Sequence, residues 1–398
     1  MATRGGRKRS RLGPISNAAQ VGNSEDLLIE ILLRLPAKPL LMFKSVSKQW
    51  YSIISNPEFT VTCAKRNPNP QLGFLLDARL NFQPHPRPLF LSLGGYQYGK
   101  HPSFLDSPHL EIHHLCNGLL CYSKPHLSSP QITSYYVCNH SSGQSKWLRV
   151  LGSPDNGRVK AFNVAFDPLL SPHYRLVFVS ELSVVDEYRL IKIDIYSSKT
   201  KSWRASTRGI YILQYDIGFH ISVYWRDAIY WYNQNNQSLA YFDFNDDSLE
   251  ILPKPQVTET MTYYYFGESG GHLHFVGSWR PWTSLFTVFE MLEDRSGWFV
   301  KYDGDFGALA TAFPKMVTNK PIRPYVFSVV NLLRGKKEGE VIIVLVIPEG
   351  VIWYNVRDET SKKLCNLSLS QSKLQQNLCI YIFSHFDIER GLSLNVEI

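Results

Sequence analysis

The spacing of apolar residues separates a short helical segment near the N-terminus from a long segment with a β pattern. From Leu27 to Leu35, seven of nine residues are apolar, the exceptions being Glu30 and Arg34. Ser24 suits the N-cap position ahead of this run, and Pro36 cannot continue a helix. The pattern therefore predicts a first helix that ends before Pro36.

Two further helices are expected directly behind the first. Pro39 suits the first turn of a second helix around residues 40–44. A third helix runs from about Val46 to Ile54 and carries Trp50, and the pair Asn56-Pro57 ends it. Residues 23–66 are thus predicted to form a compact unit of three helices.

The first helix has more apolar surface than one small unit can cover. One face holds Leu28, Ile31, Leu32 and Leu35, whereas the other faces hold Leu27, Ile29 and Leu33. A unit of about 40 residues is too small to bury both sides by itself. Either the helix docks against the rest of the chain or it presents a surface to a partner protein, and we favour the partner.

Behind the helices, the chain changes to short apolar or aromatic runs separated by turn signals. Residues 67–108 are rich in proline and are expected to hold a connection and the first strands, and the β domain proper is expected over 109–398. A recurring unit has two halves. The first half is a tight turn followed by alternating apolar residues, at 116–120, 224–231, 269–275 and 348–353. The second half is an aromatic strand, a polar turn and a Trp or Leu, at 135–147, 193–203, 241–249 and 286–298.

The period of this unit predicts the architecture. The anchors Trp147, Trp203, Leu249 and Trp298 are spaced by 56, 46 and 49 residues. A period near 50 residues, built of four short strands, is typical of propeller blades, and the span from 67 to the C-terminus has room for about six or seven of them. The sequence therefore predicts a multi-domain α plus all-β protein, in which a three-helix unit precedes a propeller. A pair of β-sandwiches or an irregular β domain is the alternative.

The formal net charge of +8 is concentrated near the N-terminus. Five of these charges are supplied by Arg4, Arg7, Lys8, Arg9 and Arg11. The rest of the chain is nearly balanced, so nucleic acid is not an expected partner. Residues 1–22 are predicted to be a disordered basic tail, with a nuclear address as the alternative.

Other features of the composition indicate a soluble intracellular protein. The hydrophobic fraction is 44% and the charged fraction 19%, which is an ordinary globular balance. The six cysteines are sparse and no pair has C-x-x-C spacing, and no signal peptide is visible. The longest apolar run, Val341 to Ile347, is far shorter than the ~20 residues of a membrane span. We therefore expect the nucleus, the cytoplasm or both, with free thiols and no membrane contact.

One segment has the pattern of a catalytic loop. Gly267-Glu268-Ser269-Gly270-Gly271 satisfies G-x-S-x-G, but a nucleophile elbow needs a helix behind the serine. The following residues, His272 to Val276, alternate as a strand instead. A β-hairpin turn that uses the positive φ of glycine is the better interpretation.

Two histidine clusters have spacings that metal ligands use. His272 and His274 lie two apart on one face of a predicted strand, and His113, His114 and Cys116 form the second cluster. For neither cluster can the further ligand that would complete a metal site be identified, so strand packing is the simpler interpretation.

The remaining polar motifs fit no catalytic arrangement. The acidic pairs Asp246-Asp247 and Glu293-Asp294 fall in the repeated turns, where Asp serves the backbone. No nucleophile, base and oxyanion donor come together in the pattern. We therefore expect a binding protein without catalytic residues, metal or cofactor.

The stretch from Glu25 to Trp50, which reads EDLLIEILLRLPAKPLLMFKSVSKQW, closely resembles an F-box. The segments behind it resemble the F-box-associated, kelch-like repeats of the large plant F-box family, at 116–121, 165–168, 196–200, 267–273 and 296–302. The resemblance spans about residues 25–365, and both halves indicate the same family.

This resemblance implies a substrate-recognition subunit of a Skp–cullin–F-box ubiquitin ligase. The F-box would bind a Skp-type adaptor and, through it, a cullin scaffold, while the propeller would hold an unidentified target protein for ubiquitination and degradation. The positions that match the F-box apolar framework are Leu27, Leu28, Ile31, Leu32, Leu35, Pro36, Leu40, Val46 and Trp50. The contact set of the family mixes adaptor-facing and internal residues, and the sequence does not separate the two.

Two segments depart from the family pattern. Asn23-Ser24 stands where Leu-Pro usually opens an F-box, which removes some adaptor contact. Ser384 to Ile398 differs from the strand that usually closes the ring, which leaves ring closure open.

Two other functions remain open from the sequence. In the first, the propeller mouth senses a carbohydrate or small ligand, with Trp279, Trp282 and Tyr263 as compatible aromatic residues. In the second, a kelch-fold enzyme similar to galactose oxidase would need a copper site with Tyr, His and Cys ligands.

Overall fold

The computed structural model places two compact units, which meet in the chain between Pro68 and Asn69. The residues that it describes are 24–35, 37–56, 58–59, 62–63, 72–76, 89–92, 110–126, 129–139, 144–148, 158–168, 170–205, 209–213, 217–219, 221–233, 236–255, 262–278, 283–319, 324–334, 340–366 and 382–387. The predicted basic tail, Pro36, Asn23, Trp279 and Trp282 lie outside these residues. Each unit is described by itself below.

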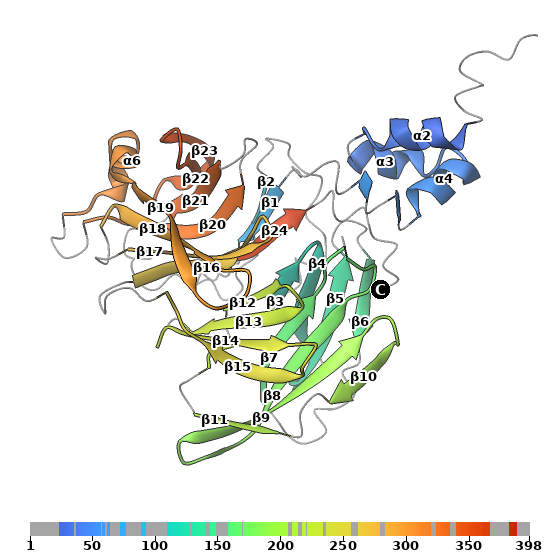
Figure 1. Cartoon of the computed structure of the whole chain (residues 1–398), viewed down its shortest axis with the longest axis horizontal. Coiled ribbons are helices and arrows are strands. Elements are labelled where there is room, and N and C mark those ends of the chain that lie inside the picture. Colours follow the sequence, from blue (N-terminus) through green and yellow to red (C-terminus); the bar gives the residue numbers. More distant parts are fainter. Residues whose placement is uncertain are drawn as a thin grey trace, which may run out of the picture. The chain divides into compact units, whose positions relative to one another are not determined.

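The N-terminal unit is helical (Figure 1). Its helices are α2 (Glu25–Leu32), α3 (Ala37–Phe43) and α4 (Lys48–Ile54). Ser47 caps α4, because its side chain accepts a hydrogen bond from the backbone N of Trp50 at 3.1 Å. Helical residues recur at 58–59 and 62–63, beyond the Asn56-Pro57 pair that was predicted to end the third and last helix. The prediction of a unit limited to three helices is therefore wrong.

The small core of this unit is formed by one side of each helix. Its buried side chains are Leu28, Leu32, Leu33, Leu40, Ile53, Ile54 and Phe59. Phe43 and Trp50 meet edge to face with ring centroids 5.2 Å apart, which joins α3 to α4. The core therefore uses only part of the apolar surface that the first helix carries.

The C-terminal unit consists of antiparallel sheets whose strands follow one another in chain order (Figure 1). One sheet contains β3 (Glu111–Cys116), β4 (Leu119–His126), β5 (Ser129–Asn139) and β6 (Gln144–Leu148). The next has five strands, β7 (Arg158–Ala165), β8 (Arg175–Val185), β9 (Tyr188–Ser197), β10 (Ser202–Ala205) and β11 (Ile210–Leu213). The third contains β12 (Ile221–Trp225), β13 (Ala228–Asn233), β14 (Ser238–Asp243) and β15 (Ser248–Leu252). The next two contain β16 (Thr262–Ser269), β17 (His272–Ser278), β18 (Leu285–Met291) and β19 (Trp298–Asp305); and β20 (Ser328–Arg334), β21 (Val341–Ile347), β22 (Gly350–Asn355) and β23 (Thr360–Asn366).

A further sheet joins the two ends of this unit. It has three strands in the order β2-β1-β24, from β1 (Leu72–Leu76), β2 (Leu89–Ser92) and β24 (Ile382–Asp387). β24 also lies beside β3 and β20, the first strands of two other sheets. The segment from Ser384 onward, in which no closing strand was recognised, thus holds part of a strand that pairs with the N-terminal side of the unit.

The predicted number of blades is wrong. Among the described residues, five sheets have the four or more strands of a propeller blade, whereas six or seven blades were predicted. The sheet that contains β24 has only three strands within the described residues. Part of the remaining length forms helices, α6 (Gly307–Ala312) and the 3₁₀ turn η2 (Pro314–Met316), whose Leu309 and Met316 are buried. The C-terminal unit is therefore mostly β, not all β.

The second half of the repeated unit, an aromatic strand followed by a turn and a Trp or Leu, is confirmed. Its anchors lie at corresponding places in the fourth strand of their sheets, with the pairs Trp147–Tyr136, Trp203–Tyr196, Leu249–Phe242 and Trp298–Met291 across from the third strand. Of the four tight turns in the first half of the unit, three join the first and second strands of a sheet. The fourth, at 348–353, joins the second strand to the third, so that it is out of phase with the others.

The core of the C-terminal unit lies between neighbouring sheets. One cluster combines Val177 and Ile193 of one sheet with Trp231 and Phe242 of the next, and all four are fully buried. Packing of aliphatic against aromatic side chains of this kind holds successive sheets against one another.

Candidate functional site

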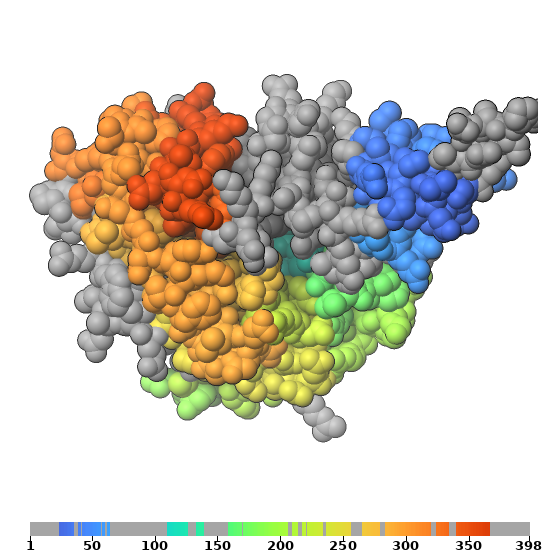
Figure 2. Space-filling view, turned by 45° about the horizontal axis from the view of Figure 1, so that its top comes forward, coloured from blue at the N-terminus to red at the C-terminus, as the bar shows by residue number. Residues whose placement is uncertain are grey.

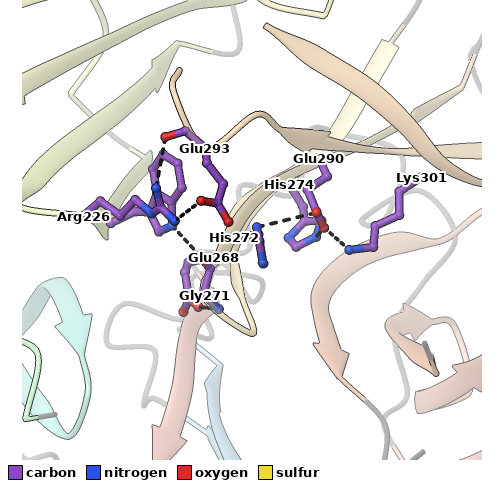
Figure 3. A network of polar contacts seen from close by, with 9 residues as sticks. Arg226, Glu268, Gly271, His272, His274, Glu290, Glu293 and Lys301 are labelled. Atoms are coloured by element: carbon purple, nitrogen blue, oxygen red, sulfur yellow. Dashed lines mark hydrogen bonds and ion pairs between the residues drawn. The ribbon is translucent and has the colours of Figure 1, made fainter. Parts of the chain in front are cut away.

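The predicted catalytic loop is a hairpin turn. Ser269 ends β16 and His272 begins β17, and both intervening glycines have positive φ, 61° at Gly270 and 87° at Gly271. The side chain of Trp225, from the neighbouring sheet, donates a hydrogen bond to the carbonyl oxygen of Gly271 at 2.6 Å. The backbone N of Gly271 donates to Glu268 Oε1 at 2.7 Å (Figure 3). The hairpin interpretation is therefore confirmed, and the turn serves to join two sheets.

The histidine pair behind that turn surrounds one buried carboxylate (Figure 3). His274 Nε2 lies 2.8 Å from Glu290 Oε2, His272 Nδ1 lies 3.5 Å from Glu290 Oε1, and the ammonium of Lys301 contacts the same carboxylate. Burial opposes ionisation of Glu290, but the hydrogen bonds from His274 and Lys301 outweigh it and hold the pKa of Glu290 at about 2. Burial lowers the pKa of His274. The cluster is thus centred on the ion pair of Lys301 with Glu290 between β19 and β18, to which His274 of β17 adds a hydrogen bond.

The second histidine cluster is dispersed. His113 Nε2 lies 2.7 Å from Ser123 Oγ, whereas His114 Nδ1 accepts a hydrogen bond from the backbone N of Val164 at 3.1 Å. The thiol of Cys116 donates to the carbonyl oxygen of Phe166 at 3.2 Å. In the part of the chain that the structure describes, no group of three or more His, Cys, Asp or Glu side chains is arranged to hold a metal ion.

The acidic pairs of the repeated turns connect sheets as well as serving the backbone. Asp294 Oδ1 accepts from the backbone N of Ser296 at 3.0 Å, as expected for an Asp in a turn. Glu293, however, pairs with Arg226 at 3.1 Å, and the carbonyl oxygen of Glu293 accepts from the same guanidinium at 3.1 Å (Figure 3). Asp247 likewise pairs with Arg204 of the preceding sheet. These contacts hold neighbouring sheets of the propeller together.

The helical unit has a different character, because large apolar side chains remain exposed there. Figure 2 shows the residues of α2–α4 in blue as one compact group. Five of its side chains are between 45% and 67% exposed, namely Leu27, Ile31, Met42, Val46 and Tyr51. Leu27 and Ile31 are one helical turn apart and therefore lie on the same side of α2. We call these five residues the helical apolar surface.

Comparison with known proteins identifies the family to which this surface belongs. Residues 24–62 match the family model of the F-box domain, and residues 98–268 match that of the F-box associated beta propeller domain. F-box protein At5g07610 of Arabidopsis thaliana is 32% identical over 397 residues, which cover 92% of this chain and 91% of that protein. The chain belongs to the F-box proteins.

Other F-box relatives match over shorter stretches. Putative F-box/kelch-repeat protein At1g12870 of Arabidopsis thaliana is 24% identical, over 58% of this chain and 59% of that protein. The matched domain is the F-box-associated propeller, so the kelch-like character of the repeats stays a prediction. Among solved structures, a nidogen/laminin complex aligns over 79% of this chain and 96% of that chain at 9% identity, with a TM-score of 0.35, a likeness that carries no argument.

The structure sorts the predicted framework residues of this F-box protein by exposure. Leu27, Ile31 and Val46 are exposed; Leu28, Leu32 and Leu40 are buried; Leu35 and Trp50 are half-buried; and Pro36 lies outside the described residues. Met42 and Tyr51, which are exposed and apolar, were not predicted. Trp50, the neighbour of Tyr51, matched the F-box framework instead, and only the phase of α4 shows that Tyr51 is exposed.

The described helices of this F-box protein include none that is both long and apolar enough to cross a bilayer. Of the aromatic residues considered for a sugar site, Trp279 and Trp282 lie outside the described residues. Tyr263 belongs to β16.

Proposed function

We propose that this chain is a substrate-recognition subunit of a Skp–cullin–F-box ubiquitin ligase. Its helical apolar surface binds a Skp-type adaptor, which connects it to a cullin scaffold, and its propeller holds the target protein. The chain itself then needs no catalytic group, because it raises the concentration of the target's lysines near a conjugating enzyme. Membership of the F-box family and the match of residues 24–62 to the F-box domain support this role.

The observation that carries the proposal is the exposure of the helical apolar surface beside a core that is already complete. Leu28 and Leu32 fill the interior of the unit, while Leu27 and Ile31 on the same helix stay in solvent. Covering a large apolar side chain that is about half exposed contributes roughly 1 kcal/mol. Five such side chains together supply a useful share of an adaptor's binding free energy before the costs of association.

The test is a pair of substitutions on the exposed side of α2. In Leu27→Glu with Ile31→Glu, the buried core residues stay unchanged and two charges are placed in the proposed interface. We expect co-purification of a co-expressed Skp-type adaptor to fall by at least about tenfold, since a buried unpaired charge costs several kcal/mol. Thermal unfolding of the variant, followed by circular dichroism, should match that of the wild type.

The matched control is Ile251→Glu, which changes an apolar residue of β15 that is 59% exposed. This variant should keep its adaptor. Undiminished adaptor binding by the α2 variant would contradict the proposal, as would an equal loss in the Ile251→Glu control.

A further inference from the structure

One sheet of the propeller extends beyond its neighbours. β7 pairs with β8 only as far as Glu181, whereas β8 and β9 continue to the pair Val185–Tyr188. The register shifts between Glu181 and Ser183, and past that irregularity β11 pairs with β9 from Ile191 to Tyr188. The end of the β8–β9 hairpin and β11 thus form a small three-stranded sheet, seen at the lower end of Figure 1. We call it the β11 extension.

The register places apolar side chains together on one face of the β11 extension. Val185, Tyr188 and Leu213 form one row across the three strands, and Leu190 and Tyr211 lie in the next row of the same face. Val185, Tyr188, Tyr211 and Leu213 are between 41% and 66% exposed. This face is therefore a contiguous apolar patch in solvent.

The opposite face of the β11 extension is covered by the propeller along β9 and β11, whereas Val184 of β8 on that face is 48% exposed. Ile212 and Arg189, which point that way, are buried, and Arg189 donates a hydrogen bond to the carbonyl oxygen of Ile217 at 2.6 Å. Gly209, directly before β11, has a φ of +133°, and a Cβ there would lie 2.9 Å from Leu190 Cδ1. Close packing therefore holds β11 in place, so the exposed face belongs to a fixed element.

The edge of the β11 extension is open. Within the described strands β11 pairs with β9 alone, so its outer edge offers backbone N–H and C=O groups in a row. Proteins usually protect such an edge with charges, proline or a covering segment, because it readily accepts another strand. β11 (Ile210–Leu213) carries no charged side chain.

The turn at the tip is acidic. Asp186 and Glu187 join β8 to β9, both are exposed, and neither makes an ion pair among the described residues. Because Leu213 lies opposite Tyr188, this acidic turn stands next to one end of β11. The patch therefore combines an apolar face, an open edge and two carboxylates at one end.

We propose that the β11 extension is the surface on which the chain holds its target, and that the occupant is an extended target segment that adds as a strand along β11. Alternate apolar side chains of that segment cover Tyr211 and Leu213, and a Lys or Arg at its end pairs with Asp186 or Glu187. Backbone hydrogen bonds supply affinity, while the alternating side chains and the basic residue supply specificity. This inference rests on the proposed function and names the target site of that ligase subunit.

The test selects ligands from a displayed library of random peptides of about ten residues, on the full chain co-purified with its adaptor. We expect enriched peptides with alternating apolar residues and a Lys or Arg at one end. Tyr211→Ser with Leu213→Ser should weaken their binding by about tenfold or more. Asp186→Asn with Glu187→Gln should weaken it less and reduce its dependence on salt. Ile251→Ser, an equally exposed apolar position on β15, should leave it unchanged.

Several results would overturn the inference. They are a library without enriched peptides, peptides that bind the Tyr211/Leu213 variant as well as the wild type, and binding that survives replacement of a central peptide residue by proline. A wild-type dimer that dissociates in the Tyr211/Leu213 variant would show that a second copy occupies the edge instead. All variants should keep their adaptor, so that loss of adaptor binding reports on the proposed function and loss of peptide binding on this inference.

Discussion

At the scale of single residues, a connection between sheets depends on residues with an unusual backbone conformation. Arg226 and Asp227 both have positive φ, 45° and 57°, at a turn whose counterparts in two other sheets are Asn117-Gly118 and Gly270-Gly271. Arg226 offsets this strain by pairing with Glu293 and by lying over the ring of Trp225, with 5.1 Å between the guanidinium carbon and the centroid. The sequence predicted the turn correctly, but the partner of Arg226 is 67 residues away and left no local signal.

The buried imidazole of His114 leads to a prediction about pH. Burial lowers its pKa to about 4 from the ordinary 6.5, against hydrogen bonds that favour the charged form. Between these values the unfolded chain takes up a proton that the folded chain refuses, so the free energy of unfolding falls as the pH is lowered. The contribution amounts to about 3 kcal/mol from pH 6.5 to pH 4. Urea unfolding at a series of pH values in this range measures it.

The variant His114→Asn isolates this contribution. The amide oxygen can still accept the hydrogen bond from Val164 N, but it does not titrate. We expect a smaller slope of stability against pH in this variant, with the remaining slope due to other groups such as His274. Equal slopes in wild type and His114→Asn would show the prediction to be wrong.

At the scale of elements, arginine–aspartate pairs join neighbouring sheets and differ in burial. Arg295, in the β18–β19 turn, bonds Asp243 of β14 at 2.5 Å and the carbonyl oxygen of Arg226 at 2.8 Å. The side chain of Asp243 is only 8% exposed. The pair Arg204–Asp247 has equally good geometry, at 2.6 and 2.8 Å, but both side chains are more than one-third exposed.

Burial should therefore decide what each pair contributes to stability. Arg295→Met leaves the Asp243 carboxylate buried and unpaired, so we expect a loss of about 3 kcal/mol in the free energy of unfolding. Arg204→Met should cost less than about 1 kcal/mol, because water screens the exposed pair. Denaturant unfolding of both variants against wild type gives the comparison. Similar losses in the two variants would contradict the argument.

Elements with a strong local pattern were predictable, and those defined by distant partners were not. The fourth strands were found because Trp or Leu lies across from an aromatic or apolar residue in four of these sheets, as in Trp203–Tyr196. The turn at 348–353 was found but assigned to the wrong hairpin, since turn chemistry is the same between any two strands. In the helical unit the apolar residues surround α2, so the sequence could not distinguish exposed Leu27 from buried Leu28. The β11 extension was missed because it depends on a pairing register.

At the scale of the whole molecule, the propeller unit depends on a contact between its two ends. β1 has β2 on one side and β24 on the other, and its Leu76 pairs with Ile382, which lies 306 positions later in the chain. The spacing of the anchors along the chain predicted the repeat but could not show this pairing. Dividing the length of the whole β segment by one repeat period overestimated the number of complete blades. A ring of sheets needs such a pairing because every sheet must have a neighbour on both sides.

A truncation tests whether the propeller is one cooperative structure closed by β24. A chain that ends at residue 381 loses the strand that pairs with β1 from Leu72 to Leu76, and with it the neighbour of β3 and β20. The backbone hydrogen bonds of that edge contribute about 1 kcal/mol each, so we expect a loss of several kcal/mol and a melting temperature lower by about 10 °C or more. A chain that ends at residue 387 keeps β24 and should melt close to the full-length protein. If both truncations melted alike, β24 would add nothing to the stability of the ring. The pairing of the two ends would then be a weak contact, and each sheet would be held mainly by its packing against the neighbouring sheets.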